Sequence, residues 1–172
     1  MSVQNAKVDN GARDDGILLY AMSARSASGE VWVPTARSAT LSGRASRDTV
    51  PEMLLRKALH RAGLRFRLHR RVPGERLTID IVLPKYRLAV FVDGCFWHGG
   101  CELHPRTEPT GPNADRWRAK FESVAERERR AAWRLAEAGW SVLRVRECDV
   151  KAAPEAIATE ILHRVKGRPT AR

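Results

Sequence analysis

The chain has 172 residues, and its 31 Lys and Arg against 20 Asp and Glu give a formal net charge of +11 at pH 7. This length is enough for one domain with a buried core and no disulfide framework. No apolar run approaches the ~20 residues needed to cross a bilayer, and the polar start from Ser2 to Gly16 excludes a secretory signal. We therefore expect a cytoplasmic protein without a membrane partner.

The excess of basic residues indicates a polyanionic partner, most simply a nucleic acid. Arg greatly outnumbers Lys, so the alternative is an Arg-rich composition that serves solubility alone. The three cysteines are an odd number, which disfavours a disulfide framework and leaves metal binding open.

Residues 1–40 are rich in Ser, Ala, Gly and Asp and lack periodicity, so we expect a poorly ordered N-terminal arm. A helix begins after Thr49, which is followed by Pro51 in the first turn and by Glu52 three residues on, as in a capping box. Apolar residues recur at helical spacing as far as Gly63. Alternating apolar and basic residues over 64–69 then predict a strand with one basic face.

Five further elements follow from their periodicity. They are strands over 77–84 and 88–92, a helix over 115–138, a strand over 140–145 and a helix over 154–166. The order α-β-β-β-α-β-α predicts one α/β domain over 41–166, with a mixed central sheet flanked by helices on both faces. Residues 167–172 are left as a C-terminal tail.

Four residues make a candidate zinc site. Cys95, Cys101, His104 and Cys148 are spaced C-x5-C-x2-H-x43-C, and a structural Zn²⁺ takes four such ligands in a tetrahedron. The ion would tie the loop after one strand to the end of the last strand. His98 is an alternative ligand to His104, and the plainer interpretation is three buried thiols with a surface histidine.

A second set of residues points to hydrolysis. Asp80 interrupts an apolar strand, where a lone carboxylate is costly unless it is paired or binds a metal, and Asp93 ends the next strand. Such carboxylates at one sheet edge suit Mg²⁺. His98 lies nearby as a candidate base for water, and Glu52 is a candidate supporting carboxylate. Together they predict Mg²⁺-dependent cleavage of a phosphodiester.

Each of these residues also has a plainer explanation. Asp93 and the following glycine are typical of a turn, Asp80 can pair with an arginine, Glu52 can act only as a cap, and His98 can make a structural hydrogen bond. Their coincidence at one sheet edge favours catalysis.

The run FVDGCFWHGGC, which begins at Phe91, resembles the signature of the very short patch repair DNA mismatch endonucleases. The resemblance extends over about 41–149 and includes RDTVPE, WRAKF, ERERR and AGWSVLRVRECD. It implies a restriction-endonuclease-like fold of the PD-(D/E)xK type with a structural zinc site. It also implies Mg²⁺-dependent nicking of one DNA strand at a T:G mismatch.

The resemblance also implies roles for individual residues. Asp80 corresponds to the metal-binding acid, His98 to the catalytic histidine, and Glu52 and Glu128 to acidic residues near the active centre. Cys95, Cys101 and Cys148 correspond to zinc ligands. Phe96, Trp97 and Trp117 correspond to aromatic residues that wedge into the base stack, although ordinary core packing is the alternative for them.

The sequence departs from the family pattern at several positions. Ile79 stands where the family often has proline, and Asp93 stands where some members have histidine, which suggests Asp80 and Asp93 as joint Mg²⁺ ligands. Cys95 occupies the lysine position of the broader nuclease pattern. A Gly-Gly pair replaces a His-rich run, so His104 is expected to supply the missing zinc ligand.

The basic strand residues Arg65, Arg67, Arg70 and Arg71 would follow the DNA phosphates, which positions an enzyme without specifying sequence. The expected partner is mismatched double-stranded DNA, with mismatch-repair proteins as further partners. We expect the protein to be a monomer in the bacterial cytoplasm, associated with the nucleoid. Three alternatives remain. They are a nuclease of the same fold that acts on other mismatched, modified or foreign DNA, a non-catalytic zinc-stabilised DNA-binding module, and a basic scaffold without zinc.

Overall fold

A computed structural model describes residues 47–98, 100, 102, 104–105, 108–111 and 113–167. The predicted arm over 1–40, the zinc-ligand candidate Cys101 and the tail from 168 onward lie outside these residues. The described helices are α2 (Val50–Arg61), α3 (Ala114–Glu137), α4 (Glu147–Ala152) and α5 (Pro154–Lys166), with a short 3-10 helix at Pro84–Tyr86. The strands are β1 (Arg67–Arg71), β2 (Thr78–Leu83), β3 (Leu88–Asp93) and β4 (Ser141–Arg146).

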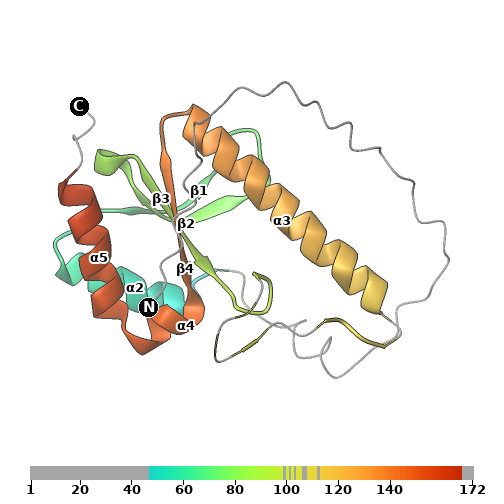
Figure 1. Ribbon diagram of the computed structural model, residues 1–172. Helices are drawn as coiled ribbons and strands as arrows, with labels where there is room; N and C mark the ends of the chain where they lie inside the picture. The colour runs from blue at the N-terminus through green and yellow to red at the C-terminus, as the bar shows by residue number, and fades with distance from the viewer. Residues whose placement is uncertain are drawn as a thin grey trace.

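The four strands form one mixed sheet in the order β1-β2-β3-β4 (Figure 1). β1 pairs antiparallel with β2, and β2 pairs antiparallel with β3. β3 and β4 are parallel, because the chain crosses over through α3 before it returns as β4. Their register places Phe91 opposite Arg144 and Asp93 opposite Arg146. The ends of β3 and β4 therefore meet at one edge, where the loop after β3 leaves the sheet.

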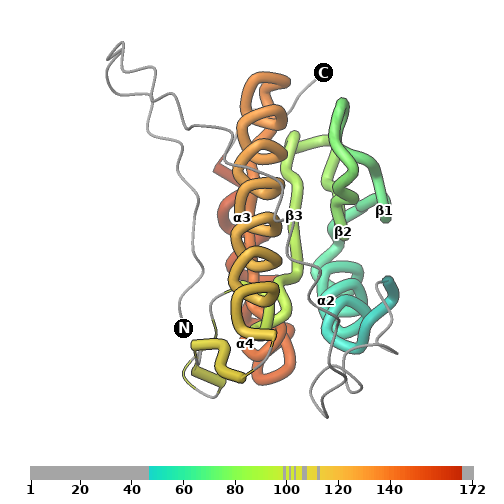
Figure 2. Tube along the Cα trace, turned by 90° about the vertical axis from the view of Figure 1, so that its right-hand side faces the viewer, coloured from blue at the N-terminus to red at the C-terminus, as the bar shows by residue number. Residues whose placement is uncertain are grey.

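Helices cover both faces of the sheet, as the element order predicts. Helix α3 lies on one face, and α2, α4 and α5 lie on the other (Figure 1). In the view of Figure 2, α3 runs lengthwise beside β3. Each face buries its own apolar cluster: Ala131 and Leu135 of α3 pack with Ala89 and Phe91 of β3, whereas Leu55 of α2 belongs to the cluster shared with α5.

The helix boundaries agree closely with the sequence, with one omission. The last helix covers the predicted residues, and the first is preceded by Thr49 as its N-cap. The Thr49 hydroxyl, however, donates to the Glu52 carboxylate at 2.8 Å and caps no backbone N–H. Helix α4 was not predicted. Cys148, which was expected to follow the last strand, does so as part of this helix.

The first strand begins three residues later than the alternation of apolar and basic residues suggests. Leu64 is buried in the α2–α5 cluster and Phe66 packs against it, so both belong to the connection after α2. Within β1, Leu68 is 37% exposed and every residue except His69 is classed as exposed. The predicted single basic face is thus wrong, because β1 is an edge strand with exposed side chains on both faces, and Arg70 lies on the face opposite Arg67 and Arg71.

The mixed α/β fold with helices on both faces is confirmed. Within the described part of the chain, no helix combines the length and apolar character needed to span a membrane.

Candidate active site

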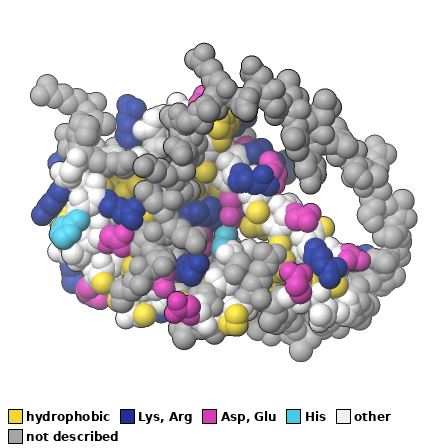
Figure 3. All heavy atoms as spheres, viewed as in Figure 1, with side chains coloured by type: hydrophobic (Ala, Val, Ile, Leu, Met, Phe, Trp, Pro, Cys, Tyr) yellow, Lys and Arg dark blue, Asp and Glu magenta, His cyan; other side chains and the backbone are white. Residues whose placement is uncertain are grey.

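A pocket of about 430 Å³ opens between the sheet and α3. Side chains alternate between the two faces along a strand, and those of Asp80, Asp93 and Arg144 all point to the α3 face. The pocket that they line therefore lies on that face. The lining residues are Arg47, His69, Leu77, Thr78, Asp80, Phe91, Val92, Asp93, Trp97, His98, Lys120, Val124, Arg127, Glu128 and Arg144. Figure 3 shows acidic and histidine side chains lying among Lys and Arg near the middle of the visible face.

Asp80 lies on β2 at the wall of this pocket. Its Oδ2 accepts a hydrogen bond of 2.8 Å from the backbone N–H of Val92 on β3. Burial raises the pKa of Asp80 to about 6, and the nearby carboxylates of Glu52 and Asp93 add to this, although the Val92 N–H opposes it. A carboxylate that is half protonated near pH 6 is one that a bound cation would stabilise strongly.

Asp93 ends β3 and is held by an arginine from the neighbouring strand. Arg144 donates from Nε to Asp93 Oδ2 at 2.6 Å and from Nη2 to Oδ1 at 2.7 Å. The same Nη2 lies 3.0 Å from Oε2 of Glu128 on α3. Burial alone would lower the pKa of Arg144, but these two carboxylates raise it above its usual value.

His98 lies between two carboxylates. Its Nδ1 is 3.2 Å from Glu128 Oε1, and its Nε2 is 3.9 Å from Asp93 Oδ1. Burial alone would raise the pKa of Glu128, but the hydrogen bond from His98 and the charge of Arg144 hold it below its usual range. Glu128 is therefore ionised, as is required to fix the orientation of an imidazole.

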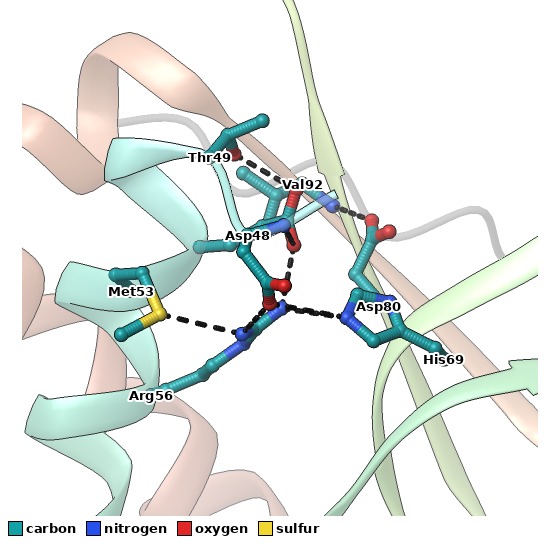
Figure 4. Close-up of polar contacts among 8 residues, drawn as sticks. Asp48, Thr49, Met53, Arg56, His69, Asp80 and Val92 are labelled. Carbon is teal, nitrogen blue, oxygen red and sulfur yellow. Dashed lines mark hydrogen bonds and ion pairs between the residues drawn. The ribbon is translucent and has the colours of Figure 1, made fainter. Parts of the chain in front are cut away.

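Glu52 belongs to a separate cluster of charged side chains around Arg56. Arg56 donates to Glu52 Oε2 at 2.6 Å and to Asp48 Oδ1 at 2.5 Å, and His69 Nε2 is 3.2 Å from the same Asp48 oxygen. Figure 4 shows the Arg56 guanidinium between Asp48 and His69, with the Asp80 carboxylate above His69 in this view and bonded to Val92. Ligand atoms of Asp48, Glu52 and His69 lie within 4.8 Å of one another, but Arg56 already forms ion pairs with both carboxylates.

Three of the four predicted zinc ligands are close together. Ligand atoms of Cys95, His104 and Cys148 lie within 4.8 Å of one another. The sulfurs of Cys95 and Cys148 are 3.0 Å apart, longer than the ~2.05 Å of a disulfide, and His104 Nδ1 is 3.2 Å from Cys148 Sγ. The donor set of two thiols and an imidazole fits Zn²⁺. The fourth candidate, Cys101, is outside the described residues.

The three predicted wedge residues form one aromatic cluster beside the pocket. Phe96 contacts Trp97 edge to face at 4.9 Å and Trp117 at 5.6 Å between ring centroids. Phe121 of α3 completes the cluster and stacks on Trp117. All four rings are partly exposed, so the cluster presents an apolar surface next to His98.

The predicted phosphate-contacting arginines lie on the edge strand. Arg67, Arg70 and Arg71 belong to β1 and Arg65 precedes it, and all four are exposed. β1 also contributes His69 to the pocket wall, so this basic surface continues toward Asp80.

Several pocket residues were missed by sequence reasoning. Arg144 is the clearest, and its signal was present: one arginine in an apolar strand needs a buried carboxylate partner. Lys120 and Arg127 line the pocket from α3, one helical turn either side of Val124. The Nε of Arg127 is buried without a hydrogen-bond partner in the described part of the chain.

Comparison with known proteins connects this site to a family. The family model described as DNA mismatch endonuclease Vsr matches residues 29–103. The type II nicking enzyme V.XorIIP of Xanthomonas oryzae pv. oryzae is 43% identical over 107 residues, which cover 61% of this chain and 74% of that protein. The type II nicking enzyme V.NaeI of Lentzea aerocolonigenes is 37% identical over 133 residues, covering 76% and 78%.

Two further comparisons are with a mismatch endonuclease and with a solved structure. The DNA mismatch endonuclease Vsr of Escherichia coli K12 is 37% identical over 117 residues, covering 67% of this chain and 71% of that protein. The catalytic domain of the homing endonuclease I-Bth0305I has a TM-score of 0.41 and 19% identity, covering 67% of this chain and 92% of that chain. The latter likeness is too remote to assign the fold.

A carboxylate–histidine pocket in a strongly basic protein suits a DNA endonuclease, and the relatives are named as nicking enzymes and as a DNA mismatch endonuclease. The chain belongs to the Vsr family of DNA mismatch endonucleases. The predicted family resemblance is therefore confirmed.

Proposed function

We propose that this protein is a Mg²⁺-dependent, zinc-stabilised endonuclease that nicks one strand of double-stranded DNA at T:G mismatches. The observation that carries the proposal is the arrangement of Asp80, His98 and Glu128 around one pocket, in a chain of the Vsr family. The restriction-endonuclease-like description of the fold is part of the same proposal. We place the activity in the bacterial cytoplasm, on nucleoid DNA, with the enzyme as a monomer and mismatch-repair proteins as partners.

The pocket residues divide the chemistry between them. Asp80 would hold Mg²⁺, which when bound stabilises the negative charge that develops on the phosphate. Glu128 accepts the Nδ1 proton of His98, so that His98 Nε2 can take a proton from the attacking water. Lys120 and Arg127 on the pocket wall would neutralise the phosphodiester. Asp93 lies on the same sheet face and is the second predicted Mg²⁺ ligand.

Glu52 would affect the reaction indirectly, through Asp80. It is buried and ion-paired with Arg56, and its charge is close enough to Asp80 to affect the pKa of that residue. It would therefore strengthen the field that attracts a cation to Asp80, without touching the phosphate.

The cysteine cluster would serve stability. Cys95 follows β3 and Cys148 lies in α4, so a Zn²⁺ held by Cys95, Cys101, His104 and Cys148 would join the loop to the end of β4. Cys95 N–H also donates to Glu147 at 3.1 Å, which ties the loop to the same helix. The ion would thus fix the loop that carries both His98 and the aromatic cluster.

The aromatic cluster would detect the substrate. A mismatched pair is easier to unstack than a matched one, so inserting Phe96, Trp97 or Trp117 would cost less free energy at a mismatch. Because these rings adjoin His98, unstacking would bring the neighbouring phosphate to the pocket. Arg65, Arg67, Arg70 and Arg71 would contact phosphates along the flanking duplex.

A nicking assay on labelled duplexes tests the proposal. Wild-type protein with Mg²⁺ should nick the T-containing strand of a T:G duplex, and Asp80→Asn and His98→Ala should lose at least ~100-fold in rate while binding DNA with little change. Glu137→Gln and His163→Ala are matched controls, because both residues are exposed and distant from the pocket. Undiminished cutting by Asp80→Asn would refute the assigned site.

The substrate panel separates the alternatives. Cutting of matched, methylated or otherwise mismatched duplexes at the T:G rate would indicate a nuclease of the same family with another target. Salt-dependent binding without cutting in Mg²⁺ or Mn²⁺ would indicate a DNA-binding module.

A further inference from the structure

Arg144 lies in the pocket among three other ionisable side chains. Its Nε and Nη2 donate to the two oxygens of Asp93 at 2.6 and 2.7 Å. Nη2 also lies 3.0 Å from Glu128 Oε2 and 3.3 Å from His98 Nδ1. The side chain is 19% exposed and lines the pocket, so it is not sealed in the core. The reaction as proposed so far leaves this cation without a role.

The third nitrogen of the Arg144 guanidinium remains available. Nε and Nη2 are bonded to Asp93, whereas Nη1 forms no hydrogen bond within the part of the chain that the structure describes and is not buried. A guanidinium carries only donors and stays charged at any working pH. Nη1 therefore offers its N–H groups to an anion that enters the pocket.

The guanidinium is also held in one orientation. Its two bonds to Asp93 are the bidentate, charge-assisted kind that fixes geometry as well as charge. Cζ of Arg144 lies 5.4 Å from the centre of the Phe91 ring, within the range of a cation–π contact. Phe91 is opposite Arg144 in the parallel register, and Asp93 ends the same strand. A donor that is fixed before the substrate arrives needs no reorganisation during the reaction, and such donors stabilise transition states most effectively.

The charges of the pocket call for a cation at this position. Three carboxylates line it, those of Asp80, Asp93 and Glu128, and together they would repel a phosphodiester. Lys120 lines the pocket from α3, but Arg144 is in contact with two of the three carboxylates. Its charge therefore offsets theirs where the phosphate has to approach.

The same contacts bear on the role of Asp93. Each of its oxygens keeps a second lone pair, but a Mg²⁺ bound there would lie beside the guanidinium, and two neighbouring cations repel each other strongly in a partly buried site. Asp80 differs, because within the described residues its carboxylate accepts from the Val92 N–H and pairs with no arginine. Asp80 is thus suited to a metal ion, and Asp93 to the arginine.

We propose that Arg144 is a further catalytic residue of this endonuclease: its guanidinium donates from Nη1 to the phosphate that is cut, and Asp93 holds it there as a positioning residue instead of binding Mg²⁺. The inference deepens the proposed function and rests on it for the identity of the substrate. Arg144 acts as a built-in cation that stabilises the charge developing on the phosphate oxygens. It neither gives up a proton nor forms a covalent bond.

An ion pair with a merely structural role gives different expectations, because breaking it affects stability and leaves the reacting phosphate untouched. Three variants separate the two roles. Arg144→Ala removes the cation, Arg144→Lys keeps the charge without the planar fork, and Asp93→Asn loosens the guanidinium. Arg164→Ala is the matched control, because Arg164 pairs with Glu160 on α5, across the sheet from the pocket.

The first measurement is the single-turnover nicking rate of a T:G duplex at saturating enzyme. We expect Arg144→Ala to lose ~100–1,000-fold in rate, the effect of removing one donor that stabilises a transition state, with little change in DNA affinity. Arg144→Lys should lose less, and Arg164→Ala should cut at the wild-type rate. Methylguanidine in the buffer should restore part of the rate of Arg144→Ala, without raising its unfolding temperature and without any effect on Asp80→Asn.

The second measurement needs no DNA. Binding of Mn²⁺ to the zinc-loaded protein, followed by electron paramagnetic resonance, compares Asp80→Asn with Asp93→Asn. Asp80→Asn should lose most of the affinity for Mn²⁺. Asp93→Asn should lose much less, because in this assignment Asp93 influences the ion through its charge and does not bind it.

The outcomes decide the inference in both directions. A wild-type nicking rate in folded Arg144→Ala overturns it, and so do equal losses of Mn²⁺ affinity in Asp93→Asn and Asp80→Asn. If Arg144→Ala does not fold, the double variant Arg144→Ala/Asp93→Asn takes its place, since it leaves Asp93 without an unpaired charge, and a wild-type rate there has the same meaning. Absence of T:G nicking by wild type refutes the proposed substrate, and the variants are then compared on the duplex that wild type cuts.

Discussion

The carboxylate of Asp80 on β2 accepts a hydrogen bond of 2.8 Å from the backbone N–H of Val92 on β3. This contact fixes the acid against the strand whose end carries Asp93 and the loop with His98. A single donor does not compensate for its burial, however, and the pKa of Asp80 is raised to about 6. The acid is thus positioned for binding a cation at a cost in stability.

This cost predicts a pH dependence. Between about pH 4 and pH 6 the native protein keeps a proton on Asp80 that the unfolded chain has released. The free energy of unfolding therefore falls by about 3 kcal/mol as the pH rises through that window. In Mg²⁺-free buffer, Asp80→Asn should therefore be more stable than wild type above pH 7 by ~1–3 kcal/mol, and the two should converge below pH 4. Urea unfolding across pH measures the difference. Asp115→Asn, an exposed change, should show no such trend; an equal trend would contradict the prediction.

The burial of the Arg56–Glu52 pair predicts that replacing Arg56 lowers the free energy of unfolding much more than replacing Arg61, another arginine of α2. Arg56 is 8% exposed and is bonded to buried Glu52, so Arg56→Met leaves a buried carboxylate unpaired and should cost ~3–5 kcal/mol of unfolding free energy. Arg61 forms its ion pair with Glu155 on the surface, with 63% and 65% exposed side chains. Arg61→Met should change stability by less than ~1 kcal/mol. Similar losses in the two variants would show that Glu52 is not desolvated.

The cysteine cluster predicts one tightly held metal ion. Elemental analysis of purified protein should find about one Zn²⁺ per chain, and Cys148→Ser and His104→Ala should lower this occupancy and destabilise the protein, because structural Zn²⁺ contributes folding free energy. His163→Ala, an exposed histidine on α5, is the control. Full zinc content in His104→Ala would remove that residue from the ligand set.

The aromatic cluster predicts a loss of mismatch discrimination. Trp97→Ala and Trp117→Ala should weaken binding to a T:G duplex by ~5–150-fold, as expected for loss of one base–aromatic contact of ~1–3 kcal/mol, and should affect a matched duplex less. Trp133 provides the control, since it is 54% exposed on α3 and outside the cluster. Equal losses on matched and mismatched DNA would mean that the rings only pack.

The exposed arginines of β1 predict a salt effect. Arg70→Gln and Arg71→Gln should each reduce the slope of log affinity against log salt by about one if each contacts one phosphate. Arg129→Gln is the control, because Arg129 is paired with Glu126 on α3. An unchanged slope in the β1 variants would move the DNA-binding surface elsewhere.

Much of the fold followed from local pattern. Helix α5 and the buried strand β3 have strong periodicity, and their bounds are close to those predicted. Helix α4 was missed because its six residues continue directly from β4 and are too few to show a helical repeat. The start of β1 was predicted three residues too early, because Leu64 and Phe66 alternate with arginines as residues of a strand do. In the structure both belong to the connection after α2 and pack with the core cluster shared by α2 and α5.

The site was predictable where the chemistry is close in sequence. Asp80, Asp93 and His98 were placed at one sheet edge from strand order alone, and the structure brings all three into one pocket. Glu128 and the wedge residue Trp117 come from a helix more than twenty residues beyond Asp93, so only family resemblance indicated them. The lone arginine in an apolar strand indicated that Arg144 needs a carboxylate partner, but which carboxylate it meets is set by the parallel pairing of β3 and β4.

The position of β1 at the end of the sheet also bears on how the protein behaves at high concentration. An edge strand offers unpaired backbone groups to which a second molecule could add its own strand, and rows of charge discourage such growth. Because Arg67, Arg70 and Arg71 are all exposed there, two molecules approaching through this edge would repel each other. The arginines proposed to attract DNA would therefore also protect the protein from aggregation.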